Sequence, residues 1–238
     1  MVARLPELRA DDGLFRAPGQ TDGPGTVQNT YHAVQLASTV DRTKEIVTAE
    51  TVRTLRALWS AGLPEADVVR AASIMVLGGH EQPEWTEAAR DILAEVTARS
   101  VTRDTVLGDA RLLRMAPHLG AVDDFVEIEP FPIENVEDRH LAWSQLMLAD
   151  DVSRHDLAPY TDTLSRLPQD LARPENLRMP QLQAALHLID GEVPDDVDHW
   201  FVDVKGCEGF PELYRLSLDE TACSLEASVL ALELGYVQ

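Results

Sequence analysis

Residues 28–34 read Gln-Asn-Thr-Tyr-His-Ala-Val, and the pattern returns as Glu-Asp-Arg-His-Leu-Ala-Trp over 137–143 and as Glu-Ala-Ser-Val-Leu-Ala-Leu over 226–232. The three segments align without gaps, and each carries an alanine at the same position: Ala33, Ala142 and Ala231. Apolar residues follow at helical spacing in each copy. The pattern therefore predicts equivalent helices, each with a small-residue face on which another helix can pack.

Paired alanines at 71–72 and 184–185 carry the same small-residue signature. Helices of this class would start near residues 26, 66, 103, 137, 179 and 219. This spacing of roughly 40 residues is the length of a two-helix repeat. Most of the intervening helices are richer in arginine and glutamate, which predicts an inner and an outer layer. We expect an all-α chain, one domain over 1–238, whose six or so helix pairs close into an α/α toroid; an open α-solenoid has the same local pattern.

Periodicity, capping residues and turn residues set the expected boundaries of the individual helices. We expect helices over residues 26–39, 48–62, 65–79, 83–99, 103–115, 136–150, 156–167, 180–189 and 219–234. A Gly/Pro-rich loop, 11–25, precedes the first helix. An irregular acidic insert, 121–134, fits a degenerate outer helix better than a lid or a docking strand. The 197–204 segment fits either a helix or a strand.

The charge of the chain excludes one class of partner. Forty-one acidic residues against 20 basic ones give a formal net charge of −21. Such a surface repels phosphate backbones and anionic lipid headgroups, so we expect neither nucleic acid nor a membrane surface as a partner. A basic protein is a better electrostatic match.

Cysteine usage and hydropathy suggest a compartment. Cys207 and Cys223 are too few for a disulfide framework in a chain of this length, which favours a reducing compartment. The N-terminal residues lack the apolar run of a signal peptide, and no stretch approaches the ~18 apolar residues of a membrane span. These features predict a cytoplasmic, soluble protein.

The two ends of the chain share a loop-and-helix motif. Gly13-Leu14-Phe15 leads to a helix that reads Thr-Val-Gln-Asn-Thr-Tyr-His-Ala-Val from Thr26, and Gly209-Phe210 leads to Ser-Leu-Glu-Ala-Ser-Val-Leu-Ala-Leu from Ser224. This motif resembles the repeats of the prenyltransferase and terpenoid-cyclase toroids. The resemblance implies an axial cavity that encloses a hydrophobic, isoprenoid-type small molecule. It also implies that polar residues near the starts of the inner helices ring one mouth of that cavity.

The acid motif of the proton-initiated cyclases, Asp-x-Asp-Asp, is absent from the sequence. We interpret the acidic pairs as solvated turns: Asp11-Asp12, Asp123-Asp124, Asp150-Asp151 and Asp195-Asp196. The protein prenyltransferases hold zinc through aspartate, cysteine and histidine, and Asp219 and Cys223 lie four apart at the predicted start of the last helix. An N-cap aspartate and a buried cysteine explain that pair equally well. We assign no metal and no cofactor.

A set of polar and aromatic residues near the starts of the inner helices remains as the candidate site. We predict three catalytic residues, because histidine exchanges protons near neutral pH and an acidic neighbour raises its pKa: His32, Asp138 and His140. We predict four substrate-binding residues: Asn29, Tyr31, Trp143 and Asp219. Each histidine could instead be a partly buried structural side chain, and each aromatic ring a core residue.

These observations give one leading functional hypothesis and two alternatives. The leading hypothesis is a terpenoid cyclase-like or prenyltransferase-like enzyme of natural-product metabolism that uses acid–base chemistry. The first alternative is an accessory protein that keeps the toroid and has lost catalysis, in line with the missing acid motif. The second is an open helical scaffold whose concave face binds a protein.

Overall fold

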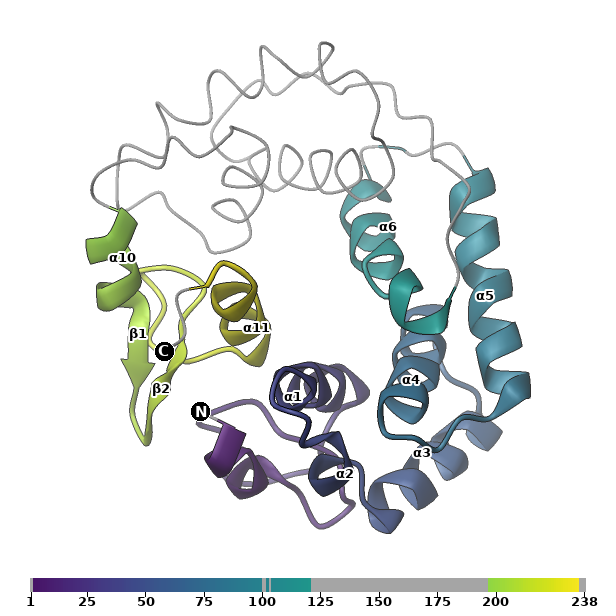
Figure 1. The fold of residues 1–238 in the computed structure, drawn as a ribbon, viewed down its shortest axis with the longest axis horizontal. Helices are drawn as coiled ribbons and strands as arrows, with labels where there is room; N and C mark the ends of the chain where they lie inside the picture. Colours follow the sequence, from purple (N-terminus) through teal and green to yellow (C-terminus); the bar gives the residue numbers. More distant parts are fainter. Residues whose placement is uncertain (1, 100–101, 103, 121–196, 236–238) are drawn as a thin grey trace.

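The computed structural model describes residues 2–99, 102, 104–120 and 197–235. Within these residues the chain is mostly helical, with a small two-stranded antiparallel sheet (Figure 1). The N-terminal elements are η1 (Val2–Leu8), α1 (Val27–Ser38), α2 (Thr43–Ile46), α3 (Ala49–Ala61), α4 (Glu65–Leu77), α5 (Pro83–Ala98), α6 (Val106–Leu113) and η2 (Ala116–Leu119). The C-terminal elements are α10 (Val197–Val204), β1 (Lys205–Cys207), β2 (Phe210–Tyr214) and α11 (Leu225–Glu233).

The described helices lie in two layers. Figure 1 shows α11, α1, α4 and α6 along the inner side of an arc, with α3 and α5 outside them. Helix α1 packs against both α4 and α11, and α5 packs against both α4 and α6. The small residues that the sequence places on α4 lie in this packing, where Ala71 and Ala72 are fully buried. Small side chains let the backbones of neighbouring helices approach closely.

Capping residues fix most helix boundaries where the sequence predicts them. The Thr26 hydroxyl accepts a hydrogen bond from the backbone N–H of Asn29 at the start of α1. Thr48 and Thr51 form a reciprocal capping box at the start of α3. Pro83 occupies the first turn of α5, where its missing N–H costs no hydrogen bond. The helices expected over 26–39, 48–62, 65–79 and 83–99 are therefore confirmed, and the one expected over 103–115 is shorter, as α6.

In the C-terminal part, the structure corrects two predictions and decides one alternative that the sequence left open. The all-α prediction is wrong at β1 and β2, which pair as an antiparallel hairpin. The ambiguous 197–204 segment is helix α10. The last helix begins at Leu225 instead of Asp219, because the Ser224 hydroxyl accepts from the N–H of Ala227 and caps it. The preceding loop is held by the Arg215 guanidinium, which donates to the carbonyls of Leu218 and Glu220.

The two cysteines are paired. Cys207 of β1 forms a disulfide with Cys223, the residue before the cap of α11, with their Cα atoms 5.7 Å apart. The expected reducing compartment rested on these cysteines forming no framework, and their pairing removes that ground, since disulfides persist in oxidising environments. The disulfide ties the hairpin to the start of the last helix.

Several predictions fall on residues outside the described part of the chain. These are the acidic insert 121–134 and the helices expected over 136–150, 156–167 and 180–189. The candidate residues Asp138, His140 and Trp143 lie there too.

The N-terminal unit contains a small hydrogen-bond network around the start of α1. Phe15 and Thr26 form a β-bridge, in which the Thr26 N–H donates to the Phe15 carbonyl at 2.9 Å. The Phe15 N–H donates to the buried Thr30 hydroxyl at 2.9 Å, and that hydroxyl donates to the Thr26 carbonyl at 2.7 Å. Arg9 bridges the other side of Phe15 and places its guanidinium 5.2 Å from the ring centre. The network joins the loop firmly to α1.

The C-terminal unit repeats that network around the start of α11. Tyr214 and Ser224 form a β-bridge, in which the Ser224 N–H donates to the Tyr214 carbonyl at 2.9 Å. The Tyr214 N–H donates to the Ser228 hydroxyl at 3.0 Å, and that hydroxyl donates to the Ser224 carbonyl at 2.9 Å. Lys205 pairs with Tyr214 and lies 5.8 Å from its ring centre. Each bond has its counterpart in the N-terminal unit.

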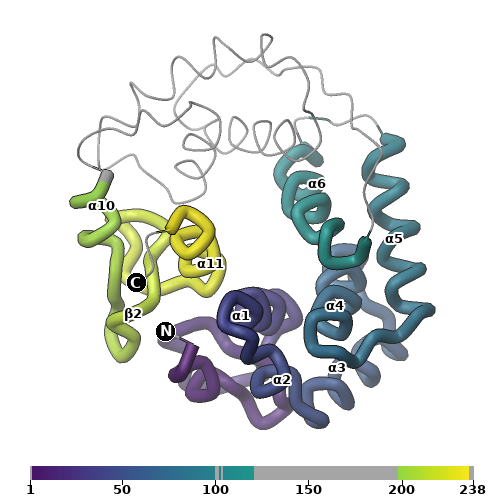
Figure 2. The backbone as a smooth tube through the Cα atoms, viewed as in Figure 1, coloured from purple at the N-terminus to yellow at the C-terminus, as the bar shows by residue number. Residues whose placement is uncertain are grey.

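The two ends of the chain are therefore two copies of the same structural repeat, and these copies lie side by side (Figure 2). The signature of the repeat is a leucine, an aromatic residue and an arginine, as Leu14-Phe15-Arg16 and Leu213-Tyr214-Arg215. The predicted equivalence of Gly13-Leu14-Phe15 with Gly209-Phe210 is wrong. Phe210 is the first residue of β2 and pairs with Cys207, whereas Tyr214 takes the place of Phe15.

Candidate functional site

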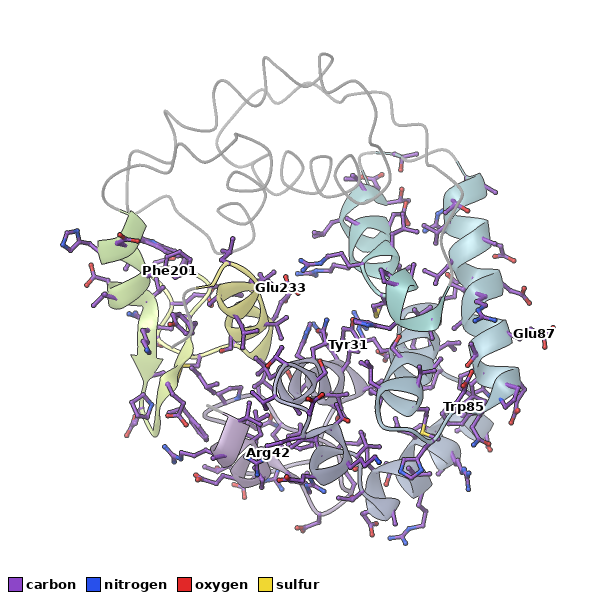
Figure 3. The ribbon with its side chains drawn as sticks, viewed as in Figure 1. Tyr31, Arg42, Trp85, Glu87, Phe201 and Glu233 are labelled. Carbon is purple, nitrogen blue, oxygen red and sulfur yellow. A yellow bond between two sulfur atoms is a disulfide. The ribbon has the colours of Figure 1, made fainter. Side chains whose placement is uncertain are left out.

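A cavity lies between α1, α4, α6 and α11, where the first and last repeats meet. The space between its walls is about 490 Å³, a value that includes open solvent, so the cavity is a partly open one. Its lining combines polar, charged and apolar side chains from all four helices: Gln28, Tyr31, His32, Gln35, Arg70, Arg111, Arg114, Met115, Glu226, Val229 and Leu230. In Figure 3, Tyr31 and Glu233 are labelled on the sides of α1 and α11 that face α6.

The structural repeat explains which residues of α1 and α11 reach the cavity. Tyr31 and His32 follow the cap of α1 at the same offsets at which Val229 and Leu230 follow the cap of α11. All four line the cavity, so the same face of each repeat is turned toward it. The first repeat presents a phenol and an imidazole there, and the last presents two aliphatic side chains. The cavity therefore has an apolar wall on α11.

The opposite wall carries arginines. Arg70 comes from α4, Arg111 from the last turn of α6, and Arg114 is the residue that directly follows α6. Arg70 is paired with Asp67 at 2.8 Å and Arg111 with Glu226 at 3.3 Å, while Arg114 pairs with Glu233. These carboxylates restrict the guanidinium groups, each of which has five N–H donors to offer. The opposite wall therefore consists of three ion pairs, in which each guanidinium is balanced by one carboxylate.

Tyr31 is buried in the cavity wall with its polar end unpartnered. Its side chain is 4% exposed, and its hydroxyl has no hydrogen-bond partner within the described residues. The ring centre lies 5.4 Å from that of His32 and 6.2 Å from that of His118. Burial raises the pKa of the Tyr31 phenol above its ordinary value, so it stays protonated and can donate. The Nε of Arg111 is likewise buried without a partner.

His32 is held in one orientation beside Tyr31. Its Nδ1 lies 3.1 Å from the Gln35 side-chain oxygen, one turn along α1. In the tautomer that donates from Nδ1 to this oxygen, Nε2 carries the lone pair and can accept a proton. Burial lowers the pKa of His32, and the nearby Glu226 carboxylate opposes that shift. The ring is therefore neutral at pH 7 and suited to act as a base.

The other described candidates lie away from the cavity lining. The backbone N–H of Asn29 helps to cap α1, and its side chain is half-buried in the first turn. Asp219 lies in the loop before α11, where it accepts a hydrogen bond from the Ser217 hydroxyl. The structure thus brings Tyr31 and His32 together, but it brings neither Asn29 nor Asp219 to them.

A zinc site built on Asp219 and Cys223 does not fit this structure. Cys223 is bound to Cys207 in the disulfide and has no thiolate to offer a metal. Asp219 is also not on α11, so the predicted one-turn spacing on a shared helix face is wrong. Within the described ranges, no group of three or more His, Cys, Asp or Glu side chains could hold a metal ion.

The three arginines were missed by the sequence analysis, which assigned arginine to the outer helices. Two signals could have found them. The 40-residue spacing itself places residues 103–115 in the inner class, and that segment carries Arg111 and Arg114. Arg70 directly precedes the alanine pair at 71–72, which was assigned to the inner class for its small residues. A charged side chain on an inner helix must find a partner or face a cavity.

No protein-family model, no curated protein and no solved structure matches this chain. In the part of the chain that the structure describes, no helix is long and apolar enough to cross a membrane.

Proposed function

We propose that the chain is an α/α toroid of about six helix pairs that encloses an isoprenoid-type small molecule in an axial cavity. The packing of α1 against α11 carries this proposal, because it joins the first repeat to the last. In an open solenoid each repeat contacts only its neighbours, so the two ends of the array stay apart. The equivalent faces of these two end repeats are turned toward the same cavity.

The apolar wall supports a hydrophobic ligand. Val229 and Leu230 of α11 and Met115, next to the end of α6, give the cavity aliphatic and thioether surface. Small-molecule sites combine such surface with a few polar groups that orient the ligand. Here Tyr31 and His32 are the polar groups of α1.

The chemistry that we propose is proton transfer. Neutral His32 would take a proton from the bound molecule, and protonated Tyr31 would stabilise charge by donating a hydrogen bond. Asp138 and His140 remain the other proposed catalytic residues, on the repeat of residues 137–143. Product analysis after incubation with isoprenoids tests this step. Loss of turnover in both H32A and H140A would support it, and full turnover in the double variant would overturn it.

A non-catalytic accessory protein is the second candidate. The absence of the Asp-x-Asp-Asp acid motif from the whole sequence favours it. Such a protein would bind the same ligand in the same cavity without converting it. Product analysis would then recover only the starting compound. Binding without turnover, in the wild type and in H32A alike, would select this candidate over the enzyme.

A thermal-shift experiment with farnesol tests ligand enclosure. A ligand at ~100 times its Kd stabilises the folded state by about 2.7 kcal/mol, which raises the Tm of a chain of this size by about 5–11 °C. V229T should reduce the shift, because it places a hydroxyl on the apolar wall. V202T is the matched control, since Val202 is 71% exposed on α10. No shift with farnesol, or an equal shift in V229T and wild type, would contradict the proposal.

Small-angle scattering tests the closure of the array. A compact chain of this length has a radius of gyration of about 18 Å. A closed toroid should give a value near this, and an elongated open solenoid a clearly larger one.

A further inference from the structure

We infer that the Tyr31–His32 pair of the cavity catalyses the enolisation of a neutral carbonyl ligand, with Tyr31 holding the carbonyl oxygen and His32 removing a proton from the neighbouring carbon. This inference rests on the proposed function, because it names the substrate class of the same cavity: an uncharged isoprenoid ketone or aldehyde with a C–H bond next to its carbonyl group. Three features of the cavity lead to it, namely an unpartnered hydroxyl, an oriented imidazole and a balanced set of charges.

The Tyr31 hydroxyl needs a hydrogen-bond acceptor. The Tyr31 side chain lines the cavity and is 4% exposed, and among the residues that the structure describes its hydroxyl has no partner. Buried polar groups in folded proteins are nearly always hydrogen-bonded. Because burial raises the pKa of the phenol, the hydroxyl keeps a proton to donate. A carbonyl oxygen is an acceptor without a proton of its own, so it meets this need.

His32 supplies a base beside that donor. Its ring centre lies 5.4 Å from that of Tyr31, and both side chains line the cavity. In the tautomer in which Nδ1 donates to the Gln35 side-chain oxygen at 3.1 Å, Nε2 keeps its lone pair. Proton abstraction next to a carbonyl group needs a donor at the oxygen and a base at the adjacent carbon. These two neighbouring residues provide both.

The charge balance of the cavity favours a neutral ligand. Each guanidinium group of the lining is paired with a carboxylate: Arg70 with Asp67, Arg111 with Glu226 and Arg114 with Glu233. An anionic head group would compete with those carboxylates, whereas an uncharged carbonyl group leaves the ion pairs in place. The aliphatic side chains of Val229 and Leu230 give surface for the hydrocarbon part of the ligand.

The reaction moves one proton. The Nε2 of His32 takes the proton from the carbon next to the carbonyl group, and the electron pair of the broken C–H bond forms a C=C bond. The π electrons of the carbonyl group move onto its oxygen, where the hydrogen bond from Tyr31 stabilises the developing charge. Return of a proton from the His32 imidazolium to the carbon restores the ketone. The step balances without an oxidant or a reductant.

Hydrogen exchange in deuterium oxide tests the inference directly. The probe is geranylacetone, an isoprenoid ketone, and nuclear magnetic resonance follows the loss of the proton signals on the carbons next to its carbonyl group. We expect the wild-type chain to accelerate this exchange. H32Q, which lacks the base, and Y31F, which lacks the donor, should each slow the catalysed exchange by about 100-fold. H80Q is the matched control and should match the wild type, because His80 is an exposed histidine outside the lining.

Stability and binding of Y31F give a readout that separates chemistry from packing. Removing a buried hydroxyl without a partner should leave the Tm of the free protein unchanged or higher. Calorimetric titration should show that Y31F still binds geranylacetone, so that the loss lies in the exchange rate at saturation. A Y31F variant that lost stability, binding and exchange together would indicate that Tyr31 acts through packing, and would overturn its assignment as the donor.

The outcomes also separate this inference from the proposed function. Geranylacetone that binds the wild-type chain without accelerated exchange would overturn the inference and leave the enclosure of an isoprenoid standing. Exchange that is as fast in H32Q as in the wild type would overturn the inference as well. If neither farnesol nor geranylacetone binds, the proposed function is wrong and the inference falls with it.

Discussion

Thr30→Val tests the hydrogen-bond network that defines the structural repeat. The Thr30 side chain is fully buried, and its hydroxyl makes two hydrogen bonds. It accepts from the Phe15 N–H at 2.9 Å and donates to the Thr26 carbonyl at 2.7 Å. Valine keeps the shape and the branching of threonine, so the substitution removes the hydroxyl without opening a cavity.

The cost follows from these two bonds. Each intramolecular hydrogen bond contributes a net ~1 kcal/mol, and a buried donor left without a partner costs about 1–3 kcal/mol. The Phe15 N–H is that donor, since Phe15, Thr30 and the hydrogen bond between them are buried. The added methyl group returns about 0.8 kcal/mol of apolar burial. The expected net loss is about 1–3 kcal/mol, which is a fall in Tm of roughly 2–12 °C for a chain of this size.

Urea unfolding followed by circular dichroism measures this loss. T97V is the matched control, because the Thr97 hydroxyl donates to a carbonyl on the exposed side of α5. It should change the free energy of unfolding by less than about 0.5 kcal/mol. S228A, in the equivalent network of the last repeat, should cost about as much as T30V. If T30V matches T97V, the buried network does not hold the repeat together and the reasoning is wrong.

Two further predictions concern the disulfide and the buried histidine. Replacing Cys207 by serine should lower the free energy of unfolding by about 3 kcal/mol, because the Cys207–Cys223 bond closes a short loop; equal Tm values with and without a reductant would contradict this. Burial lowers the pKa of His32 in the folded state, so the unfolded chain binds more protons and stability falls as the pH drops through about 6.5. H32Q should reduce that fall in the free energy of unfolding between pH 7.5 and 5 in urea titrations. Part of the fall should remain in H32Q, because burial also lowers the pKa of His118. An unchanged pH dependence would show that His32 is not desolvated.

The helices of the first half could be predicted because their signals are local. Thr26, Thr48 and Pro83 mark helix starts through interactions within one turn, and the structure uses each of them as expected. The start of the last helix was misplaced because Asp219 and Ser224 are both good cap residues. Only Ser224 is also held in a β-bridge to Tyr214, and that contact comes from the tertiary fold.

The sequence predicted the helical part of the repeat, because Ala33 and Ala231 lie at the same offset from the caps of α1 and α11. It did not predict the β-hairpin or the loop part of the repeat, for related reasons. Strand β2 reads Phe-Pro-Glu-Leu-Tyr, which has no alternation of apolar and polar residues and contains a proline. The aromatic residue lies eleven positions before the cap in the first repeat, at Phe15, and ten before it in the last, at Tyr214. A search without gaps in that loop cannot align them.

The candidate site was predicted in part. Tyr31 and His32 were found because they follow a recognisable helix start. The arginines of the opposite wall come from α4 and from the end of α6, and their approach to α1 and α11 depends on the packing of all four helices. No spacing within a single segment encodes that approach. The available signal was an arginine on a predicted inner helix. This signal identifies the residues, but it does not say which other helices they face.

Calorimetric titration of the wild-type chain with farnesol tests the central claim most directly. The proposed site is the cavity between α1, α4, α6 and α11, whose apolar wall would hold the hydrocarbon chain. We expect farnesol to bind at one site per chain and V229T to weaken that binding. No binding by the wild type, or equal binding by V229T, would contradict the proposal.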